Sequence, residues 1–268
     1  MDELHNIKTL ASTVPKNGDV NPYGVAIVPR TMGRLHTGHI LVSNFNNQAN
    51  QQGTGTTIVD VARNGSVSLF AQIDPAHLPG ACPGGVGLTT ALVVLKAGWV
   101  IVGSLPTADG TAATAKAGCL IVLDSNGTPI ETFSGGPING PWDMTADDRG
   151  SEATLFFTNV LNGTVEANGK VVNEGTVVRL VLNLSDKKPS ISEEKVIGSG
   201  FPERTDPAAL VIGPTGLGLG FRSSGYDDEP VLYVADTLNS RVIFLPGPLT
   251  SGDQGQGITL SQGGSLNG

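Results

Sequence analysis

A strand pattern recurs four times along the chain, and this repetition constrains the fold more than any other feature of the sequence. Each copy gives a turn of small residues or proline, an apolar strand, a second strand with a polar end, a loop and two further strands. The copies cover residues 21–73, 84–134, 140–197 and 213–262. Repeats of this kind indicate a series of similar units, each of which buries its apolar face against the next.

Composition favours an all-β fold. The 268 residues include 37 Gly and 17 Pro, with 39% hydrophobic and 15% charged residues. This balance suits many short strands joined by tight turns better than it suits a helical bundle. We therefore predict a single β-propeller domain over residues 1–268, with about four blades of four antiparallel strands each.

The two ends of the chain bear on whether the predicted ring closes. Residues 7–14 (IKTLASTV) have the pattern of a lone outer strand, which we expect to complete the last blade. The final residues SLNG repeat the approach to a new copy, as PINGP does before Trp142. Four blades could close by themselves, but we favour truncation from an ancestor of about six blades. Open blade edges would then support a homo-oligomer.

Charge and hydropathy exclude several classes of partner. Acidic residues outnumber basic ones by 24 to 16, and the pI is about 4.9, so no basic stripe is expected to bind nucleic acid. The apolar run 91–102 contains Lys96 and Gly98 and is too short to cross a bilayer. The residues after Met1 lack the apolar core of a signal peptide. We expect neither a nucleic-acid nor a membrane partner.

The chain has two cysteines, Cys82 and Cys119, with no CxxC pair and no histidine at a zinc-like spacing. They could form one disulfide, or they could stay free and pack as small hydrophobic side chains. We favour the free pair. Few charges and abundant Thr, Ser, Asn and Gly favour a secreted or periplasmic protein, although the chain shows no signal peptide.

The fourth copy carries a family resemblance. GPTGLGLG at 213–220 and VLYVADTLNSRVIF at 231–244 resemble the NHL repeat, with its Pro-x-Gly-aliphatic turn, Ala-Asp pair and Asn-x-Arg segment. NPYGVAIVP at 21–29 fits as well. The second and third copies depart from the pattern, with Gly103 and Asn159 in place of Asp. The resemblance implies a noncatalytic propeller that binds a protein, peptide or small ligand on its loop-rich face.

Polar side chains at turns and strand ends should gather on one face of such a propeller. They come from two turns and three strand ends: Asn21, Asp143, Asn44, Asn159 and Asp236. Their oxygens are the type that Ca²⁺ and Mg²⁺ prefer. A similarity to regucalcin- and gluconolactonase-like propellers would place a divalent ion there, with Asp143, Asp236 and Asn21 as ligands. We favour a structural role, in which these side chains bond turn amides and Asp236 pairs with Arg241.

Two functional hypotheses follow. The preferred one is a noncatalytic binding module without cofactor, in which Trp142, Asn44 and Asn159 contact the ligand. The alternative is a lactonase-like hydrolase or lyase that depends on Ca²⁺ or Mg²⁺ at the channel mouth. The sequence contains no GxSxG, no GxxxxGK[ST], and no GxGxxG that opens a helix, so it indicates no catalytic residue by motif.

Overall fold

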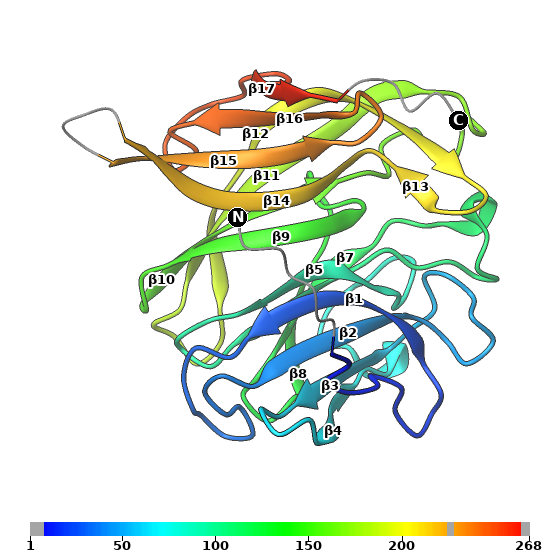
Figure 1. Cartoon of the computed structure of the whole chain (residues 1–268), viewed down its shortest axis with the longest axis vertical. Coiled ribbons are helices and arrows are strands. Elements are labelled where there is room, and N and C mark those ends of the chain that lie inside the picture. The colour runs from blue at the N-terminus through cyan, green and yellow to red at the C-terminus, as the bar shows by residue number, and fades with distance from the viewer. Residues whose placement is uncertain (1–7, 224–227, 264–268) are drawn as a thin grey trace.

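The structure, a computed structural model, describes residues 8–223 and 228–263, and in them almost all regular structure is β-strand (Figure 1). The first sheet contains β1 (Val20–Ile27), β2 (Ile40–Asn46), β3 (Thr57–Val61) and β4 (Val67–Gln72). The second contains β5 (Leu88–Val94), β6 (Val100–Ser104), β7 (Cys119–Leu123) and β8 (Pro129–Phe133). Two short 3₁₀ helices lie in loops, η1 (Pro75–His77) and η2 (Ala112–Thr114).

The third and fourth sheets follow the same plan. The third contains β9 (Pro141–Asp148), β10 (Glu152–Asn159), β11 (Val172–Asn183), β12 (Ser190–Asp206) and a short fifth strand, β13 (Leu210–Ile212). The fourth contains β14 (Pro214–Ser223), β15 (Asp228–Asp236), β16 (Arg241–Pro246) and β17 (Ile258–Gln262). In every sheet the strand order follows the chain and neighbouring strands are antiparallel.

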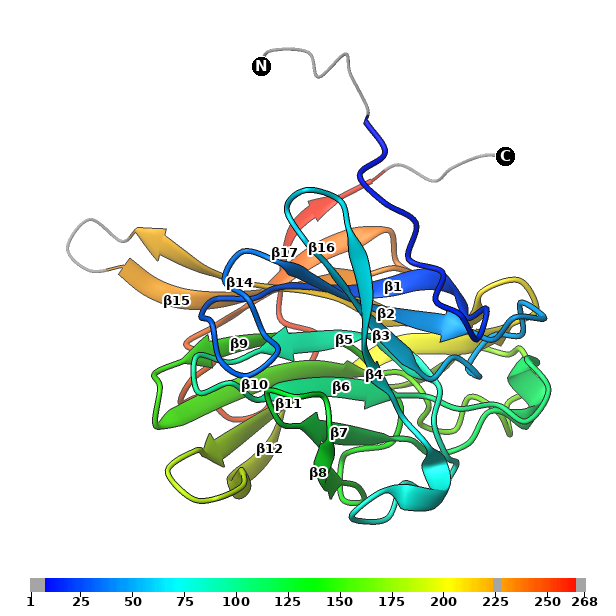
Figure 2. The same cartoon turned by 90° about the horizontal axis from the view of Figure 1, so that it is seen from below.

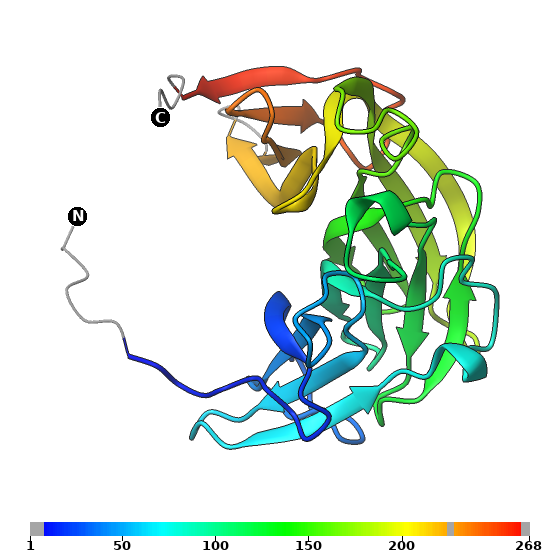
Figure 3. The same ribbon diagram turned by 90° about the vertical axis from the view of Figure 1, so that its right-hand side faces the viewer.

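The four sheets are the blades of a β-propeller, as predicted. The first strand of each blade is an inner strand, and β1 packs on β5, β5 on β9, and β9 on β14. Figure 3 shows the blades as an arc, with the first blade and the fourth blade at its two ends. Figure 2 shows the same blades from below.

Apolar layers between consecutive blades hold the arc together. Strand β6 contributes alternate side chains to two layers: Val100 and Val102 pack toward the first blade, and Ile101 packs toward the third. All five residues of β6 are buried, as are those of β7. A strand that is buried on both faces loses the alternation of apolar and polar residues that a half-exposed strand shows. This explains why the sequence of the second blade reads as continuous apolar runs.

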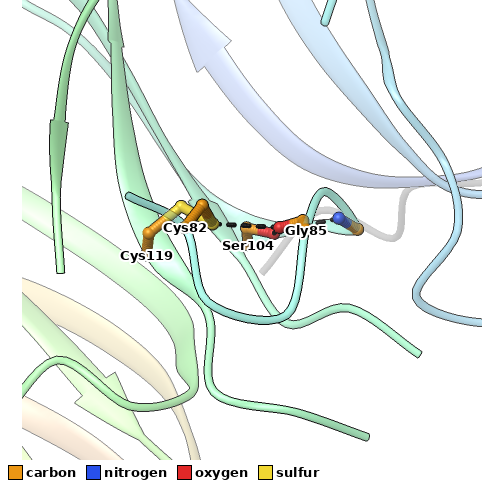
Figure 4. Close-up of a disulfide and its surroundings, with 5 residues drawn as sticks. Cys82, Gly85, Ser104 and Cys119 are labelled. Atoms are coloured by element: carbon orange, nitrogen blue, oxygen red, sulfur yellow. Dashed lines mark hydrogen bonds between the residues drawn. A yellow bond between two sulfur atoms is a disulfide. The ribbon is translucent and has the colours of Figure 1, made fainter. Parts of the chain in front are cut away.

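A disulfide joins Cys82 to Cys119, so the expectation of two free cysteines is wrong (Figure 4). The bridge links the loop before β5 to the first residue of β7, and its Cα atoms are 5.2 Å apart. The neighbouring turn is held by Ser104, whose hydroxyl donates to the carbonyl of Gly85 at 3.0 Å and accepts from the amide of Gly87 at 2.9 Å. Together these contacts fix the entry into β5, the inner strand of the second blade.

We expect the disulfide to contribute substantially to stability. The two cysteines are 37 residues apart, and closing a loop of that length should stabilise the fold by about 4 kcal/mol through the entropy of the unfolded chain. The Cys82→Ala/Cys119→Ala variant should lose about this much in urea unfolding. Wild-type protein in reducing agent should unfold at a similarly lowered urea concentration. A midpoint that does not respond to reduction would contradict a bridge in the folded protein.

The structure corrects the expectation for the N-terminal segment. Residues 8–14 form no strand, and Ile7 lies outside the described residues. Ala11 packs on apolar side chains of the first blade, and the carbonyl of Thr13 accepts a hydrogen bond from Asn44 Nδ2 at 2.9 Å. The outer strand of the fourth blade is β17, which the chain supplies from its own C-terminal part. The segment thus covers the first blade instead of completing the last one.

The two inner strands at the ends of the arc expose large apolar side chains. Ile27 on β1 is 69% exposed, and Phe221 on β14 is 67% exposed. Unpaired apolar surface at the end of a stack of sheets favours association. We propose that copies of the chain associate through these ends.

This proposal predicts a concentration-dependent rise of molar mass in light scattering. The Ile27→Lys/Phe221→Lys variant should stay monomeric, because each lysine places a charge on the contact surface. Val171, 53% exposed in the loop before β11, provides the matched control. Val171→Lys should associate as the wild type does, and a wild type that is monomeric at all concentrations would refute the proposal.

Candidate functional site

A hollow of about 450 Å³ lies between the inner strands of all four blades. Its walls combine two aromatic rings, one carboxylate, hydroxyls and aliphatic groups, from Tyr23, Val25, Thr90, Leu92, Trp142, Asp143, Met144, Thr215 and Gly216. We call it the central hollow. Most binding sites for small molecules have this character, with apolar walls and a few polar groups that orient the ligand.

Asp143, on β9, supplies the carboxylate of the central hollow. Its Oδ2 accepts a hydrogen bond from the amide of Leu217 at 2.7 Å, and its own amide donates to Thr158 Oγ1 at 3.1 Å. Burial raises the pKa of the Asp143 carboxyl, and the amides of Leu217 and Met144 offset this only in part. A larger fraction of Asp143 is therefore protonated near neutral pH than of an exposed aspartate.

Three aromatic rings pack together beside the central hollow, and two of them, Tyr23 and Trp142, line it. Tyr23 stacks on Phe45, with ring centroids 4.7 Å apart and planes 11° apart. Trp142 meets both rings edge-on, at 5.6 Å from Tyr23 and 5.5 Å from Phe45. The Trp142 side chain is almost fully buried, and its carbonyl accepts a hydrogen bond from the Thr90 hydroxyl. Trp142 thus borders the central hollow, and its contact with a ligand stays a prediction.

A second hollow, of about 550 Å³, adjoins the central one and shares Tyr23 with it. It is lined mainly by amide side chains, from Asn21, Tyr23, Asn46, Asn50, Gln52, Ala208 and Ala209. We call it the amide hollow. Asn21 Nδ2 donates to Asn46 Oδ1 at 3.2 Å, and Asn46 Nδ2 donates to Asn50 Oδ1 at 2.8 Å. A ladder of side-chain amides therefore runs along one side of it.

Two residues predicted to contact a ligand are used inside the protein instead. Asn44 is fully buried, and its Nδ2 donates to the Thr13 carbonyl and to Thr57 Oγ1. Asn159 is also buried, and its Oδ1 accepts from the amides of Asn139 and Gly140 in the turn before β9. Neither side chain lines either hollow. Asn159 thus bonds turn amides as the structural interpretation predicts, whereas Asn44 ties the N-terminal segment and β3 to β2.

The predicted metal ligands do not come together. Asp143 borders the central hollow and Asn21 the amide hollow. Asp236 is fully buried, where its Oδ2 accepts from Arg241 Nε at 2.7 Å and from Asn239 Nδ2 at 2.8 Å. Among residues 8–223 and 228–263, no group of three His, Cys, Asp or Glu side chains could hold a metal ion. The proposed Ca²⁺ or Mg²⁺ site therefore does not fit this arrangement.

The contacts of Asp236 assign it to the stability of the fourth blade. Asp236→Ala would leave the Arg241 guanidinium without its buried partner, so the variant should lose about 3 kcal/mol of unfolding free energy. Asp147→Ala is the matched control, because Asp147 bonds Arg149 at the surface; its loss should be about 1 kcal/mol or less. Equal losses of the two variants in thermal unfolding would contradict this role. So would a metal effect at this residue, in which millimolar Ca²⁺ raises the melting temperature of the wild type but not that of Asp236→Ala.

A second buried acid, Glu203 on β12, borders neither hollow. Its side chain is fully buried, and burial raises its pKa to about 9, with a further contribution from the negative charge of Glu174. Glu203 is therefore protonated at neutral pH. Because it faces no cavity found between the inner strands, we assign it no chemical step.

Sequence reasoning missed Tyr23 and the residues of the amide hollow other than Asn21, which it assigned to a metal site. Tyr23 occupies the first inner strand at a turn position comparable to that of Trp142 in the third, and this correspondence was the available signal. Asn46, Asn50 and Gln52 lie at the end of β2 and in the loop that follows, which reads as ordinary turn chemistry. In this loop, Gln52 Nε2 donates a hydrogen bond to the carbonyl of Ala208 in the third blade at 2.9 Å. No sequence signal indicates this contact.

No protein-family model matches the chain, and no curated protein sequence matches it. Similar solved structures include an α-L-arabinofuranosidase from Fusarium graminearum, with 12% identity and a TM-score of 0.46, and an α-L-arabinanase from Penicillium chrysogenum, with 11% and 0.49. The matches cover 83% and 87% of this chain. This chain spans 60% of the arabinofuranosidase and 63% of the arabinanase.

These findings correct two expectations that rested on the NHL resemblance. The assignment to the NHL-repeat family is wrong, since no family model matches and the similar solved structures are glycosidases. The hypothesis of a noncatalytic binding module is contradicted by the same solved structures, which are enzymes. Over the described residues, no helix is long and apolar enough to cross a membrane.

Proposed function

We propose that this chain is a glycoside hydrolase that works without a metal ion, with a sugar bound in the central hollow and Asp143 as its general acid. The observation that carries the proposal is the Asp143 carboxyl, which opens into the central hollow and has a pKa raised by burial. A general acid must hold its proton at the working pH, and burial is a common way to achieve this for a carboxyl group.

The walls of the central hollow suit a sugar. A sugar ring has apolar C–H faces and hydroxyls at its edge, and it needs both apolar and hydrogen-bonding surroundings. Tyr23 and Trp142 supply aromatic surface, while Thr90 and Thr215 place polar groups among them. Its described lining contains no lysine, arginine or histidine, so Asp143 has no cation there to hold it ionised.

The proposed reaction uses one proton and one water. Protonated Asp143 gives its proton to the glycosidic oxygen as the bond from that oxygen to the anomeric carbon breaks, and the bonding electrons leave with the oxygen. Water then adds to the anomeric carbon and returns a proton to the Asp143 carboxylate. Most glycosidases divide these roles between two carboxylates. The described lining of the central hollow offers one, so both roles fall to Asp143.

The first test measures hydrolysis by the wild type of neutral oligosaccharides, including arabinobiose, which is bound in the solved arabinanase. Asp143→Asn should lower kcat by about 10²- to 10⁴-fold, the usual worth of a general acid. The loss should be smaller for 4-nitrophenyl glycosides, because nitrophenolate leaves without needing a proton. Glu166→Gln, at an exposed carboxyl, is the control and should keep full activity.

The pH dependence has a definite sign. Only the protonated form of Asp143 donates, so kcat/KM for oligosaccharides should fall as pH rises through the pKa of Asp143. Because burial raises this pKa, the fall should lie at higher pH than that of an exposed aspartate. An Asp143→Asn variant that keeps its activity, or a wild type that hydrolyses no member of the panel, would refute the proposed function.

A further inference from the structure

We infer that the amide hollow is a second sugar subsite, and that the substrate is a neutral oligosaccharide whose units occupy both hollows. This inference rests on the proposed function, because it extends the substrate beyond the sugar bound next to Asp143. It assigns a role to side chains that the reaction itself does not use.

The two hollows meet at Tyr23. This residue lines both of them, and their volumes are about 450 and 550 Å³. Its ring is fixed by stacking on Phe45 and by the edge of Trp142. We place consecutive units of the oligosaccharide on either side of this fixed ring.

The chemistry of the amide hollow selects neutral, hydroxyl-rich ligands. Side-chain amides supply both hydrogen-bond donors and acceptors, and sugar hydroxyls also act as both. Within the described part of the chain, Asn21 Oδ1, Asn50 Nδ2 and Gln52 Oε1 make no hydrogen bond to protein groups, so they are available to a ligand. None of the described residues that line it has a charged side chain. A uronic acid or a phosphorylated sugar would find no cation to pair with there.

Left-handed backbone conformations gather at the amide hollow. Five described non-glycine residues have a left-handed backbone, and two of them, Asn21 with φ of 63° and Asn50 with φ of 59°, line this hollow. A third, Leu210 with φ of 65°, directly follows its lining residue Ala209. Asparagine tolerates this conformation, whereas leucine is strained in it, and such strain is commonly kept where it positions functional groups.

One wall of the amide hollow is fixed before a ligand arrives. The turn between β12 and β13 is held by Asp206, whose Oδ1 accepts from the amides of Ala208 and Ala209 at 2.9 and 3.0 Å. The Ala208 carbonyl then accepts from Gln52 Nε2, which ties the third blade to the first. A preformed wall avoids the entropy cost of ordering a loop upon binding.

Asn50→Asp tests the inference with a minimal change. Aspartate keeps the acceptor toward Asn46, tolerates the left-handed backbone, removes the free donor and adds a negative charge. We expect KM for neutral trisaccharides to rise about 10-fold, which corresponds to the loss of about one hydrogen bond. Both kcat and KM for 4-nitrophenyl monoglycosides should stay unchanged, because those substrates end before the amide hollow. Asn168→Asp is the matched control, since Asn168 also has a left-handed backbone and lines neither hollow.

The outcomes separate this inference from the proposed function. If the wild type cleaves monoglycosides and Asn50→Asp leaves trisaccharide KM unchanged, the subsite is refuted and the proposed function stands. If the wild type cleaves nothing, calorimetric titration with arabinotriose decides on the subsite alone. Binding of arabinotriose at least 10-fold tighter than arabinose, weakened by Asn50→Asp and absent for trigalacturonate, would support it. Equal affinities for arabinose and arabinotriose, or tight binding of trigalacturonate, would overturn it.

Discussion

The face-to-face burial of apolar side chains between consecutive blades is the interaction on which the rest of the structure depends. It is a long-range interaction, since Leu41 and Ile58 of the first blade pack in the same layer as Val102 of the second. Stacking through these layers sets the spacing of the inner strands. The central hollow lies between these four inner strands, so it follows from the packing of the blades. The amide hollow lies beside it, between the first blade and the turn that joins β12 to β13.

The repeated pattern made the fold predictable, because each blade must contain its own turns and strands. The segment 231–244 places β15 and β16, and its Asp236 bonds Arg241 as a structural tie, as the favoured interpretation held. The family was misjudged because such ties are requirements of a blade and do not identify one lineage. The role of residues 7–14 was also misjudged, because the pairing partner of a terminal segment depends on packing that its own sequence does not encode.

The candidate site was only partly predictable. Asp143 and Trp142 stood out because an acid and a large aromatic residue interrupt a turn where the other copies have small residues or tyrosine. Their meaning changed with the structure, since Asp143 meets aromatic rings and hydroxyls there and no other carboxylate of the hollow's described lining. The amide hollow was not predictable. It joins the loop after β2 to the β12–β13 turn, and these segments are 156 residues apart at the Gln52–Ala208 hydrogen bond.

The acidity of Asp143 and the shape of the central hollow both depend on contacts between blades. Tyr23 and Phe45 from the first blade meet Trp142, the residue before Asp143 on the third. Burial raises the pKa of the Asp143 carboxyl. The amide of Leu217 on the fourth blade opposes this effect while it fixes the orientation of the carboxylate. The pKa of Asp143 therefore depends on how the third and fourth blades meet, and a shift between them that exposes the carboxyl to water would lower this pKa.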